Sequence, residues 1–321
     1  MIKSLILISR AYALPMSFFS WLAAFAYGVS KSGNIIYGLI AFVGIALVHL
    51  GMNMFDDYID YKNLKKTDEN GKKILINAQK GKCEFLLNGK ITEIQLLFLT
   101  LVCFFWAFLI GIFFVIKTGF PVLIIMGLTA LFGLIYPIAG KFRLCEILLG
   151  LIYGPLLFLG VDYVMTGLVG WNVLLICVPT MIMTINLLHT DTMLDYELDK
   201  SEGKKTVANL FDSQKTGLFV QKILLIFGYL SIIPIFIKIE NVWLFLTYIT
   251  IPFALNLINS MELFIQDKTT LPKRTILDGL MENWDTILEE GSAGFMMRMY
   301  QARNLMVYFS IIYAGALILT N

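Results

Sequence analysis

The sequence predicts an all-α integral membrane protein with nine transmembrane helices in a single bundle. Of its 321 residues, 58% are hydrophobic and only 15% are charged, whereas about 25% of the residues of an average soluble domain are charged. Many apolar runs reach the ~20 residues that a helix needs to span a bilayer. The alternating segments of about ten residues that are typical of a transmembrane β-barrel are absent. We therefore expect one transmembrane domain over residues 1–321.

Nine apolar segments are the predicted spans. Their approximate ranges are 12–30, 34–58, 94–116, 119–138, 145–166, 171–195, 217–237, 241–263 and 302–320. Tight turns at glycines join the spans on one side, and long charged loops, 59–93, 196–216 and 264–301, lie on the other. In the last loop, apolar residues recur every fourth position, at Ile276, Leu280, Trp284 and Leu288. This spacing predicts an interfacial amphipathic helix or, as an alternative, a lid that contacts substrate.

The distribution of basic residues predicts the orientation in the cell membrane. With a cytoplasmic N-terminus, 22 of the 25 lysines and arginines lie inside and only Lys31, Lys117 and Lys238 lie outside. Cytoplasmic loops of membrane proteins carry such an excess, so we expect the N-terminus and the three long loops to be cytoplasmic. The net charge of +2 gives no indication of nucleic-acid binding. The four cysteines lack the spacing of metal ligands.

Two sets of acidic and amide side chains end the second and sixth predicted spans. The first set is Asn53, Asp56 and Asp60, and the second is Asp191, Asp195 and Asp199. Their spacings, three to four residues, place each set on one face of a helix. Both spans run toward the cytoplasmic side, so the two faces should end at the same membrane depth. This placement predicts two four-helix units plus a ninth helix.

The residue types in these sets indicate a magnesium and diphosphate site. Ligand sets made only of oxygen favour Mg²⁺ over zinc or copper, and Mg²⁺ readily takes phosphate oxygens as further ligands. Basic residues follow both sets or lie in the loop between the fourth and fifth spans: Lys62, Lys141, Arg143, Lys204 and Lys205. The apolar bundle beneath could hold a hydrocarbon tail. The competing class is a cation-coupled transporter, although transporter carboxylates usually lie near the bilayer midplane.

Four segments resemble the UbiA superfamily of intramembrane prenyltransferases. They are RAYALPMS at 10–17, NMFDDYIDYK at 53–62, YPIAGKFRLCEILLGLIYGPLLFLGVDYVMTG at 136–167 and DYELDKSEGKKTVA at 195–208. The second and fourth resemble the two aspartate motifs of that family. The chain is most similar to the MenA-like branch, the 1,4-dihydroxy-2-naphthoate polyprenyltransferases of menaquinone biosynthesis. The resemblance covers nearly the whole length.

The resemblance implies a reaction and a set of site residues. Members of the family transfer a polyprenyl group from a prenyl diphosphate to a small aromatic acceptor, with two Mg²⁺ ions bridging to the diphosphate. Carried over, Asn53, Asp56 and Asp60 hold one ion, and Asp195 and Asp199 hold the other. Asp191, where the branch often has asparagine, is a further ligand or positions the acceptor. The implied diphosphate-binding residues are Arg10, Lys62, Lys141 and Lys204.

The remaining predicted residues concern the cation and the acceptor. Tyr136 is the best placed tyrosine to stabilise an allylic carbocation with its ring. His49 and His189, close to the two sets, are expected to bind the acceptor or relay protons, or else to be hydrogen-bonded residues of the core. Departures from the family pattern, such as Ala11 and Leu144, leave the acceptor and the prenyl length open. A glyceryl phosphate ether acceptor and cyclisation of the prenyl chain are the alternative reactions.

Overall fold

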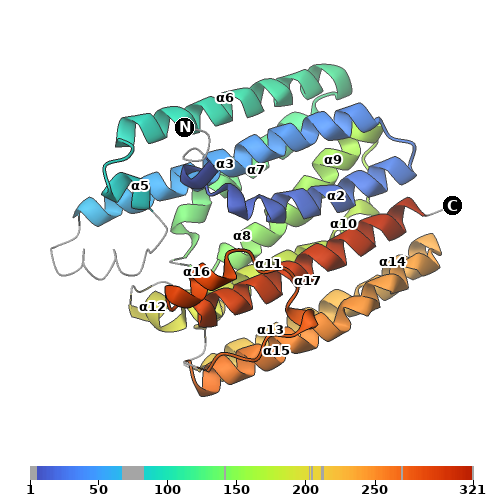
Figure 1. Cartoon of the computed structure of the whole chain (residues 1–321). Coiled ribbons are helices and arrows are strands. Elements are labelled where there is room, and N and C mark those ends of the chain that lie inside the picture. Colours follow the sequence, from blue (N-terminus) through green and yellow to red (C-terminus); the bar gives the residue numbers. More distant parts are fainter. Residues whose placement is uncertain are drawn as a thin grey trace. The chain divides into compact units, whose positions relative to one another are not determined.

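The structure is a computed structural model that describes residues 6–66, 83–140, 142–201, 203, 205–210, 213–268 and 270–319. These residues form helices joined by turns, and no strand occurs among them (Figure 1). Within the described residues, eight helical segments are long and apolar enough to cross a membrane. They are Ala11–Ser30, Ile35–Lys66, Glu93–Thr118, Pro121–Ala139, Cys145–Thr166, Val173–Leu194, Gln214–Ile239 and Val242–Gln266. They agree with the first eight predicted spans.

The ninth predicted span lies in α17 (Ala293–Ile318), which begins before the predicted start at residue 302. This helix is not among the eight apolar segments of the described residues. Its first half buries polar side chains, including Arg298, Gln301 and Asn304. A helix exists where it was predicted, but the number of nine membrane-spanning helices is not confirmed.

The chain forms two compact units. The first comprises residues 1–18 and 35–137, and the second comprises residues 19–34 and 138–321. The division after residue 137 lies close to the predicted boundary between the fourth and fifth helices. The helix α2 (Leu14–Ser30), which follows the short turn η1 (Ala11–Ala13), is divided at Phe18 instead of belonging to the first unit throughout.

Three contacts explain why the later part of α2 belongs to the second unit. Ser20 Oγ lies 3.4 Å from Thr184 Oγ1. Lys31 Nζ donates to both carboxylate oxygens of Asp162, each at 2.8 Å. Just beyond the helix, the backbone N–H of Asn34 donates to Met165 O at 2.8 Å. Polar contacts therefore fix this part of α2 along its length.

The first unit is built on α3 (Ile35–Lys66), which packs along α6 (Glu93–Thr118). The close approach of these helices requires glycine at position 51, because a Cβ there would lie 2.7 Å from the Phe104 ring. Thr92 and Gln95 form a capping box that begins α6. The unit also contains the single turn α5 (Glu84–Leu87) and α7 (Pro121–Ala139).

The second unit begins with a kinked span. It consists of α8 (Cys145–Leu151), the π-turn η2 (Ile152–Leu156) and α9 (Leu157–Thr166). Gly154 leaves helical geometry at φ −94° and ψ −105°, directly before Pro155. A Cβ at Gly154 would lie 2.7 Å from Met181 Sδ. The kink thus occurs where proline lacks an N–H donor and the neighbouring helix is close.

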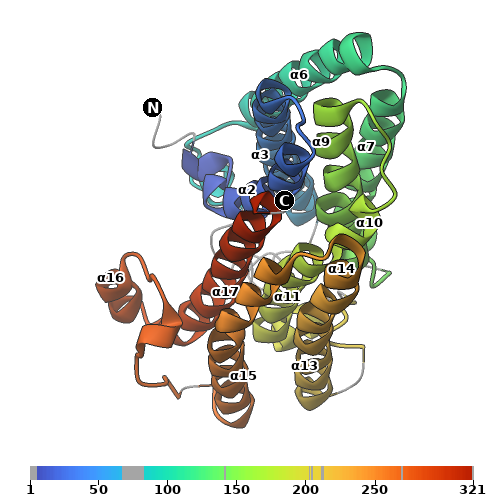
Figure 2. The ribbon, with the colours of Figure 1, turned by 90° about the vertical axis from the view of Figure 1, so that its right-hand side faces the viewer.

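The rest of the second unit is a set of packed helices. Its elements are α10 (Val173–Ile176), α11 (Val178–Leu194), α12 (Tyr196–Ser201), α13 (Gln214–Leu230), α14 (Ile232–Ile239), η3 (Val242–Thr250), α15 (Ile251–Gln266), η4 (Ile276–Asp278), α16 (Trp284–Glu289) and α17. The helix α17 packs against α11 and α15, and α11 packs against α13 (Figure 2). Large buried side chains such as Phe309 and Leu257 fill this core.

The single amphipathic helix predicted over 276–288 is not formed. Ile276–Asp278 is one 3₁₀ turn, and α16 starts only at Trp284. Between them Gly279 has φ +72° and ψ −153°, a non-helical conformation that glycine adopts far more readily than other residues. Apolar residues do recur at every fourth position, but the backbone at Gly279 prevents them from lying on one continuous helix.

Candidate active site

The first predicted set lies where the sequence placed it. Asn53, Asp56 and Asp60 belong to one continuous helix, α3, which extends to Lys66. All three are half-buried. The unbroken helix keeps their spacing on one face, so the prediction of a shared face holds in the first unit.

Arg10 is bound to this set. Its Nη2 donates to Asp56 Oδ2 at 3.0 Å and to the Asn53 carbonyl oxygen at 3.3 Å. Its Nε lies 3.6 Å from Asp57 Oδ1. In return, Asn53 Nδ2 donates to Ser9 O at 3.1 Å. The chain that leads into α2 is therefore tied to the end of α3 through the residues predicted to bind metal and diphosphate.

The charge of Arg10 is stabilised by these contacts. Burial lowers the pKa of its guanidinium, but the carboxylates of Asp57 and Asp56 together raise the pKa by more. The pKa of Arg10 therefore lies above its ordinary value. Arg10 is consequently a permanent cation next to the first set. The sequence predicted it as a diphosphate ligand, and the structure adds that it is also the ion-pair partner of Asp56.

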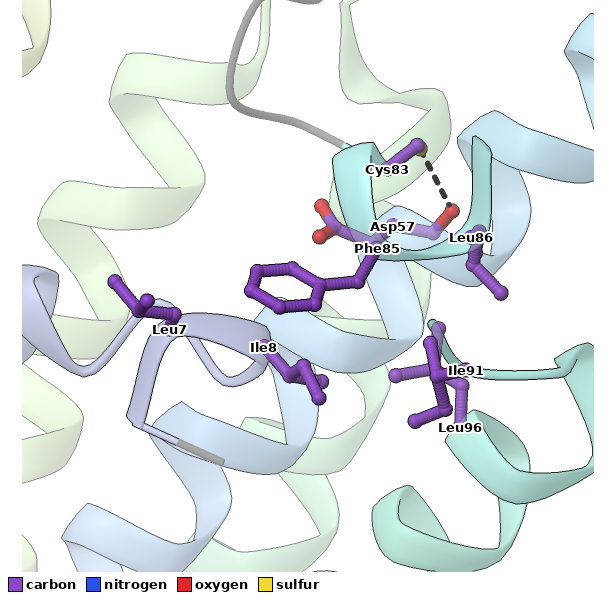
Figure 3. A pocket seen from close by; sticks show the side chains of 8 residues that line it. All are labelled: Leu7, Ile8, Asp57, Cys83, Phe85, Leu86, Ile91 and Leu96. Atoms are coloured by element: carbon purple, nitrogen blue, oxygen red, sulfur yellow. Dashed lines mark hydrogen bonds between the residues drawn. The ribbon is translucent and has the colours of Figure 1, made fainter. Parts of the chain in front are cut away.

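Asp57 is a residue that the motif reading did not assign. It is buried, 7% exposed, and its carbonyl oxygen accepts a hydrogen bond from Cys83 Sγ at 3.1 Å. Figure 3 shows it beside a small hollow lined by Leu7, Ile8, Asp57, Cys83, Phe85, Leu86, Ile91 and Leu96. Asp57 thus joins Arg10 to the α5 turn. The doublet Asp56–Asp57 was the only sequence signal for it.

The other predicted residues of the first unit surround α3 less closely. His49, one turn before Asn53, is buried and makes a short hydrogen bond through Nδ1 with Ser17 Oγ of α2. Tyr136 is half-buried near the end of α7. Lys62 is exposed, and its Nζ lies 5.0 Å from the centre of the Tyr58 ring.

The second predicted set spans a break between two helices, which falls at its middle residue, Asp195. The helix α11 ends at Leu194, Asp195 has φ −88° and ψ 11°, and α12 begins at Tyr196. The i to i−4 hydrogen bonds nevertheless continue: Asp195 N donates to Asp191 O at 3.0 Å, and Asp199 N donates to Asp195 O at 2.8 Å. The three carboxylates still succeed one another by about a turn. Asp191 and Asp195 are half-buried, and Asp199 is buried.

Glu146 of α8 is a further carboxylate beside this set, and sequence reasoning missed it. It is 4% exposed, and its charge and that of Asp199 repel each other. Its Oε1 accepts a hydrogen bond from Val207 N at 3.1 Å. Its Oε2 has no hydrogen-bond partner among the residues described. The only sequence signal was its place in the central segment quoted for the resemblance, KFRLCE.

The basic segment after the second set is fixed to the start of α8. Besides the bond from Val207 to Glu146, Lys205 N donates to Gly140 O at 2.6 Å. Lys141 and Lys204, both predicted to bind diphosphate, lie outside the described residues.

His189 has a well-defined partner. It is fully buried, and its Nε2 lies 2.9 Å from Gly217 O of α13. A carbonyl oxygen only accepts, so Nε2 carries a proton. The described residues offer Nδ1 no hydrogen-bond partner. The bond explains how His189 is oriented, and its predicted role toward the acceptor stays a prediction.

The donor types of both sets fit magnesium. Among the described residues, no three histidine, cysteine, aspartate or glutamate side chains converge on one metal position. Mg²⁺ does not need such a cage, because it keeps several waters and uses one or two carboxylates together with substrate phosphates. The carboxylate and amide oxygens of the first set, next to Arg10, fit that requirement and do not resemble the nitrogen and sulfur ligands of a zinc site.

The model of the UbiA prenyltransferase family matches residues 15–281 of the sequence. The chain belongs to the UbiA prenyltransferase family. This UbiA-family protein is accordingly a prenyltransferase, and its apolar helices make it an integral membrane protein. No curated protein matches the sequence.

Solved structures share the fold of this UbiA-family chain. A digeranylgeranylglyceryl phosphate synthase has a TM-score of 0.60 and 16% identity, covering 99% of this chain and 98% of its own. A UbiA homologue from Archaeoglobus fulgidus bound to GPP and Mg²⁺ has a TM-score of 0.60 and 13% identity, covering 98% and 99%. The apo structure of a UbiA homologue from Aeropyrum pernix K1 has a TM-score of 0.61 and 13% identity, covering 94% of this chain and 96% of its own. At these identities the likeness concerns the fold.

Proposed function

We propose that this enzyme transfers a polyprenyl group from a prenyl diphosphate to an aromatic quinone precursor such as 1,4-dihydroxy-2-naphthoate and releases diphosphate. The observation that carries the proposal is the first set on α3 with Arg10 bound to it. Carboxylates beside a permanent cation suit a ligand that brings both phosphate groups and metal ions. The MenA-like motifs favour the aromatic acceptor.

Two Mg²⁺ ions are the proposed cofactors. Asn53, Asp56 and Asp60 would hold one, and Asp195 and Asp199, with Asp191 as a further ligand or acceptor-positioning residue, would hold the other. Support comes from homologues of the same fold, whose structures contain GPP or DMAPP together with Mg²⁺. When bound, the metal neutralises diphosphate charge and so makes diphosphate a better leaving group.

The residues of this chain then act on the substrate. Arg10, Lys62, Lys141 and Lys204 bind diphosphate oxygens. The allylic C–O bond breaks and its electron pair remains on the diphosphate, while the ring of Tyr136 stabilises the cation. A carbon of the acceptor forms the new C–C bond, and the same carbon loses a proton or carbon dioxide. His49 and His189 are the proposed acceptor-side residues.

A non-aromatic acceptor is the second candidate. The digeranylgeranylglyceryl phosphate synthase matches the fold over 99% of this chain, which favours a glyceryl phosphate ether among the alternatives. Cyclisation of the prenyl chain is the third reaction and needs no acceptor. Membership of a prenyltransferase family favours the enzyme over the cation-coupled transporter.

Product analysis distinguishes these reactions. The purified protein in lipid nanodiscs is given Mg²⁺ and a series of prenyl diphosphates that begins with geranyl diphosphate and continues to longer chains. The acceptor is 1,4-dihydroxy-2-naphthoate, a glyceryl phosphate ether or nothing. We expect a prenylated naphthoquinol by mass spectrometry and diphosphate release only with the aromatic acceptor. An ether product, or a cyclised hydrocarbon without acceptor, would replace the proposal.

Asp56→Asn and Asp195→Asn test the two sets in the same assay. Each substitution removes one negative charge and keeps the side-chain size, so we expect product formation to fall at least about a hundredfold, as for the loss of a strong transition-state interaction. Asp162→Asn, whose carboxylate binds Lys31 in a different part of the second unit, serves as the control. Full activity in either of the first two variants would refute the assignment.

A further inference from the structure

The connection between α15 and α17 turns back along both helices. It leaves α15 at Gln266, yet Asp278 Oδ1 accepts a hydrogen bond from Asn256 Nδ2 at 2.8 Å. Asn256 lies ten residues before the end of α15, or about 15 Å along its axis at ~1.5 Å per residue. Figure 1 shows the segment running beside α15 to η4 and then returning to α16. Residues 270–283 are called the returning hairpin here.

The helix α17 fixes the hairpin at the same depth. Gln301 Nε2 donates to Asp278 Oδ1 at 2.7 Å. Asn304 Nδ2 donates to the carbonyl oxygens of Asp278 and Leu280 at 2.7 and 2.8 Å. These residues follow the start of α17 at Ala293 by eight and eleven positions, so the tip of the hairpin lies about 12–16 Å from that end as well.

The tip is rigid. Asp278 is 1% exposed, and its Oδ2 accepts a hydrogen bond from Thr275 N at 2.5 Å. Gly279 has φ +72°, and a Cβ there would lie 2.6 Å from Asn304 Nδ2. Because side chains of two helices and the backbone of the turn hold Asp278, the direction of the residues around it is fixed.

Two large apolar side chains of this rigid tip point away from the protein. Ile276 is 91% exposed and Leu280 is 70% exposed. Such exposure costs about 25 cal/mol for each Å² of apolar surface in water. The tip also lies beyond the last charged pair on α15, in which Glu262 binds Lys222 at 2.5 Å. From Glu262 back to its start at Ile251, α15 contains no charged residue and belongs to a segment apolar enough to span a membrane.

Charged and aromatic residues mark the level just outside the tip. Lys273 and Arg274 precede it and are exposed, and the guanidinium of Arg274 lies 5.2 Å from the Trp284 ring. On the return limb, Glu282 pairs with Arg303 at 2.8 Å. Basic residues and tryptophan are typical of the level of lipid headgroups. Toward its tip the hairpin therefore changes from basic residues, which suit lipid headgroups, to apolar residues, which suit acyl chains.

We propose that the returning hairpin is a re-entrant membrane segment. It enters the bilayer beside α15, buries Ile276 and Leu280 among the upper acyl chains of the lipid, and places Lys273 and Arg274 at the lipid phosphates. The partner of this surface is the bilayer, because the exposed apolar tip lies next to an apolar spanning helix and the limb that enters it carries the basic residues Lys273 and Arg274. This inference does not depend on the proposed reaction.

Site-specific photocrosslinking tests the depth of the hairpin. The full chain is reconstituted into liposomes of phosphatidylcholine and phosphatidylglycerol, with p-benzoylphenylalanine in place of Ile276 or Leu280. Leu255 of α15, 55% exposed in a spanning segment, is the positive control, and exposed Asp285 of α16 is the water-side control. We expect lipid adducts by mass spectrometry at 276, 280 and 255, several-fold above those at 285.

Other outcomes would overturn the proposal. Adducts at 255 without adducts at 276 and 280 would place the hairpin outside the bilayer. Crosslinks from 276 to another protein or a second copy of the chain would identify a protein partner instead. Lys273→Gln with Arg274→Gln checks the headgroup contact: we expect fewer phosphatidylglycerol adducts at 276, relative to phosphatidylcholine adducts, than with both basic residues present.

Discussion

At the scale of single residues, Arg10 and Asp56 depend on each other. The guanidinium orients the carboxylate through their 3.0 Å contact, and the carboxylates of Asp57 and Asp56 raise the pKa of Arg10. Substrate binding at this point therefore has to exchange one set of charge-assisted contacts for another. An anionic diphosphate accompanied by cationic metal ions permits that exchange without leaving either residue unpaired.

Replacement of Arg10 should affect both stability and substrate binding. Arg10→Ala removes the hydrogen bond to Asp56 and the ion pair with Asp57, and lost hydrogen bonds to charged groups cost about 1.5–3 kcal/mol. Arg10→Lys keeps the charge but cannot reach Asp56, Asp57 and the Asn53 carbonyl together. We expect a lower melting temperature for Ala than for Lys, and a raised KM for prenyl diphosphate in both. Unchanged KM in both variants would exclude Arg10 from substrate binding.

Glu146 allows charge and hydrogen bonding to be tested separately. Glu146→Gln keeps an oxygen that can accept from Val207 N, whereas Glu146→Ala removes the acceptor and about 1 kcal/mol of hydrogen-bond free energy. If its role is to hold the 205–210 segment, Gln should retain activity and Ala should lose it. Activity and thermal unfolding of both variants are measured together. Equal loss of activity in Gln and Ala would mean that the charge itself is required.

The sequence predicted features that depend on local helix geometry, and it missed contacts between residues far apart along the chain. The spacing of Asn53, Asp56 and Asp60 depends only on helix geometry, and the structure keeps it. The partners of Arg10 and Glu146 lie 46 and 61 positions away along the chain. Such contacts depend on how the helices pack, which local periodicity does not contain.

At the scale of elements, two turns depart from the predicted helices. The helix carrying the second set is interrupted at Asp195, and the helix predicted over 276–288 is divided at Gly279. Apolar periodicity predicts which side chains share a face, but it does not register backbone interruptions of one or two residues. In the second case the hydrogen bonds of Asp278 to α15 and α17 replace those of a regular helix.

Two glycines offer a matched test of the hairpin. Gly279 and Gly291 have similar φ values, +72° and +69°. A Cβ added at Gly279 would clash with Asn304 and Tyr308, whereas a Cβ added at Gly291 would have no atom within 4 Å. Alanine at such a positive φ costs about 1–3 kcal/mol, and at Gly279 the ψ of −153° adds to the strain, since that region is nearly restricted to glycine. We expect Gly279→Ala to lower the melting temperature clearly more than Gly291→Ala. Equal losses would mean that the tip yields easily and is not held rigidly.

At the scale of the whole molecule, eight spans followed directly from apolar length. The ninth segment did not, because α17 buries Arg298 among backbone carbonyls: its Nε and Nη1 donate to Ser260 O at 2.9 Å and Gly294 O at 2.6 Å. A helix that buries a hydrogen-bonded arginine in this way contains polar residues, and these lower its mean hydropathy. The sequence predicted the helix but placed its start too late.

The orientation in the membrane is the remaining whole-molecule prediction. The division of the basic residues, 22 against 3, predicts a cytoplasmic N-terminus and a cytoplasmic connection after α12, with the turns at Gly119 and Gly167 outside. Alkaline phosphatase fused after Gly119 or Gly167 in a bacterial host should be active, whereas fusions after Gly203 should be inactive. Green fluorescent protein at the same positions should give the opposite pattern. Active phosphatase after Gly203 would reverse the topology and move the second aspartate motif to the outer face.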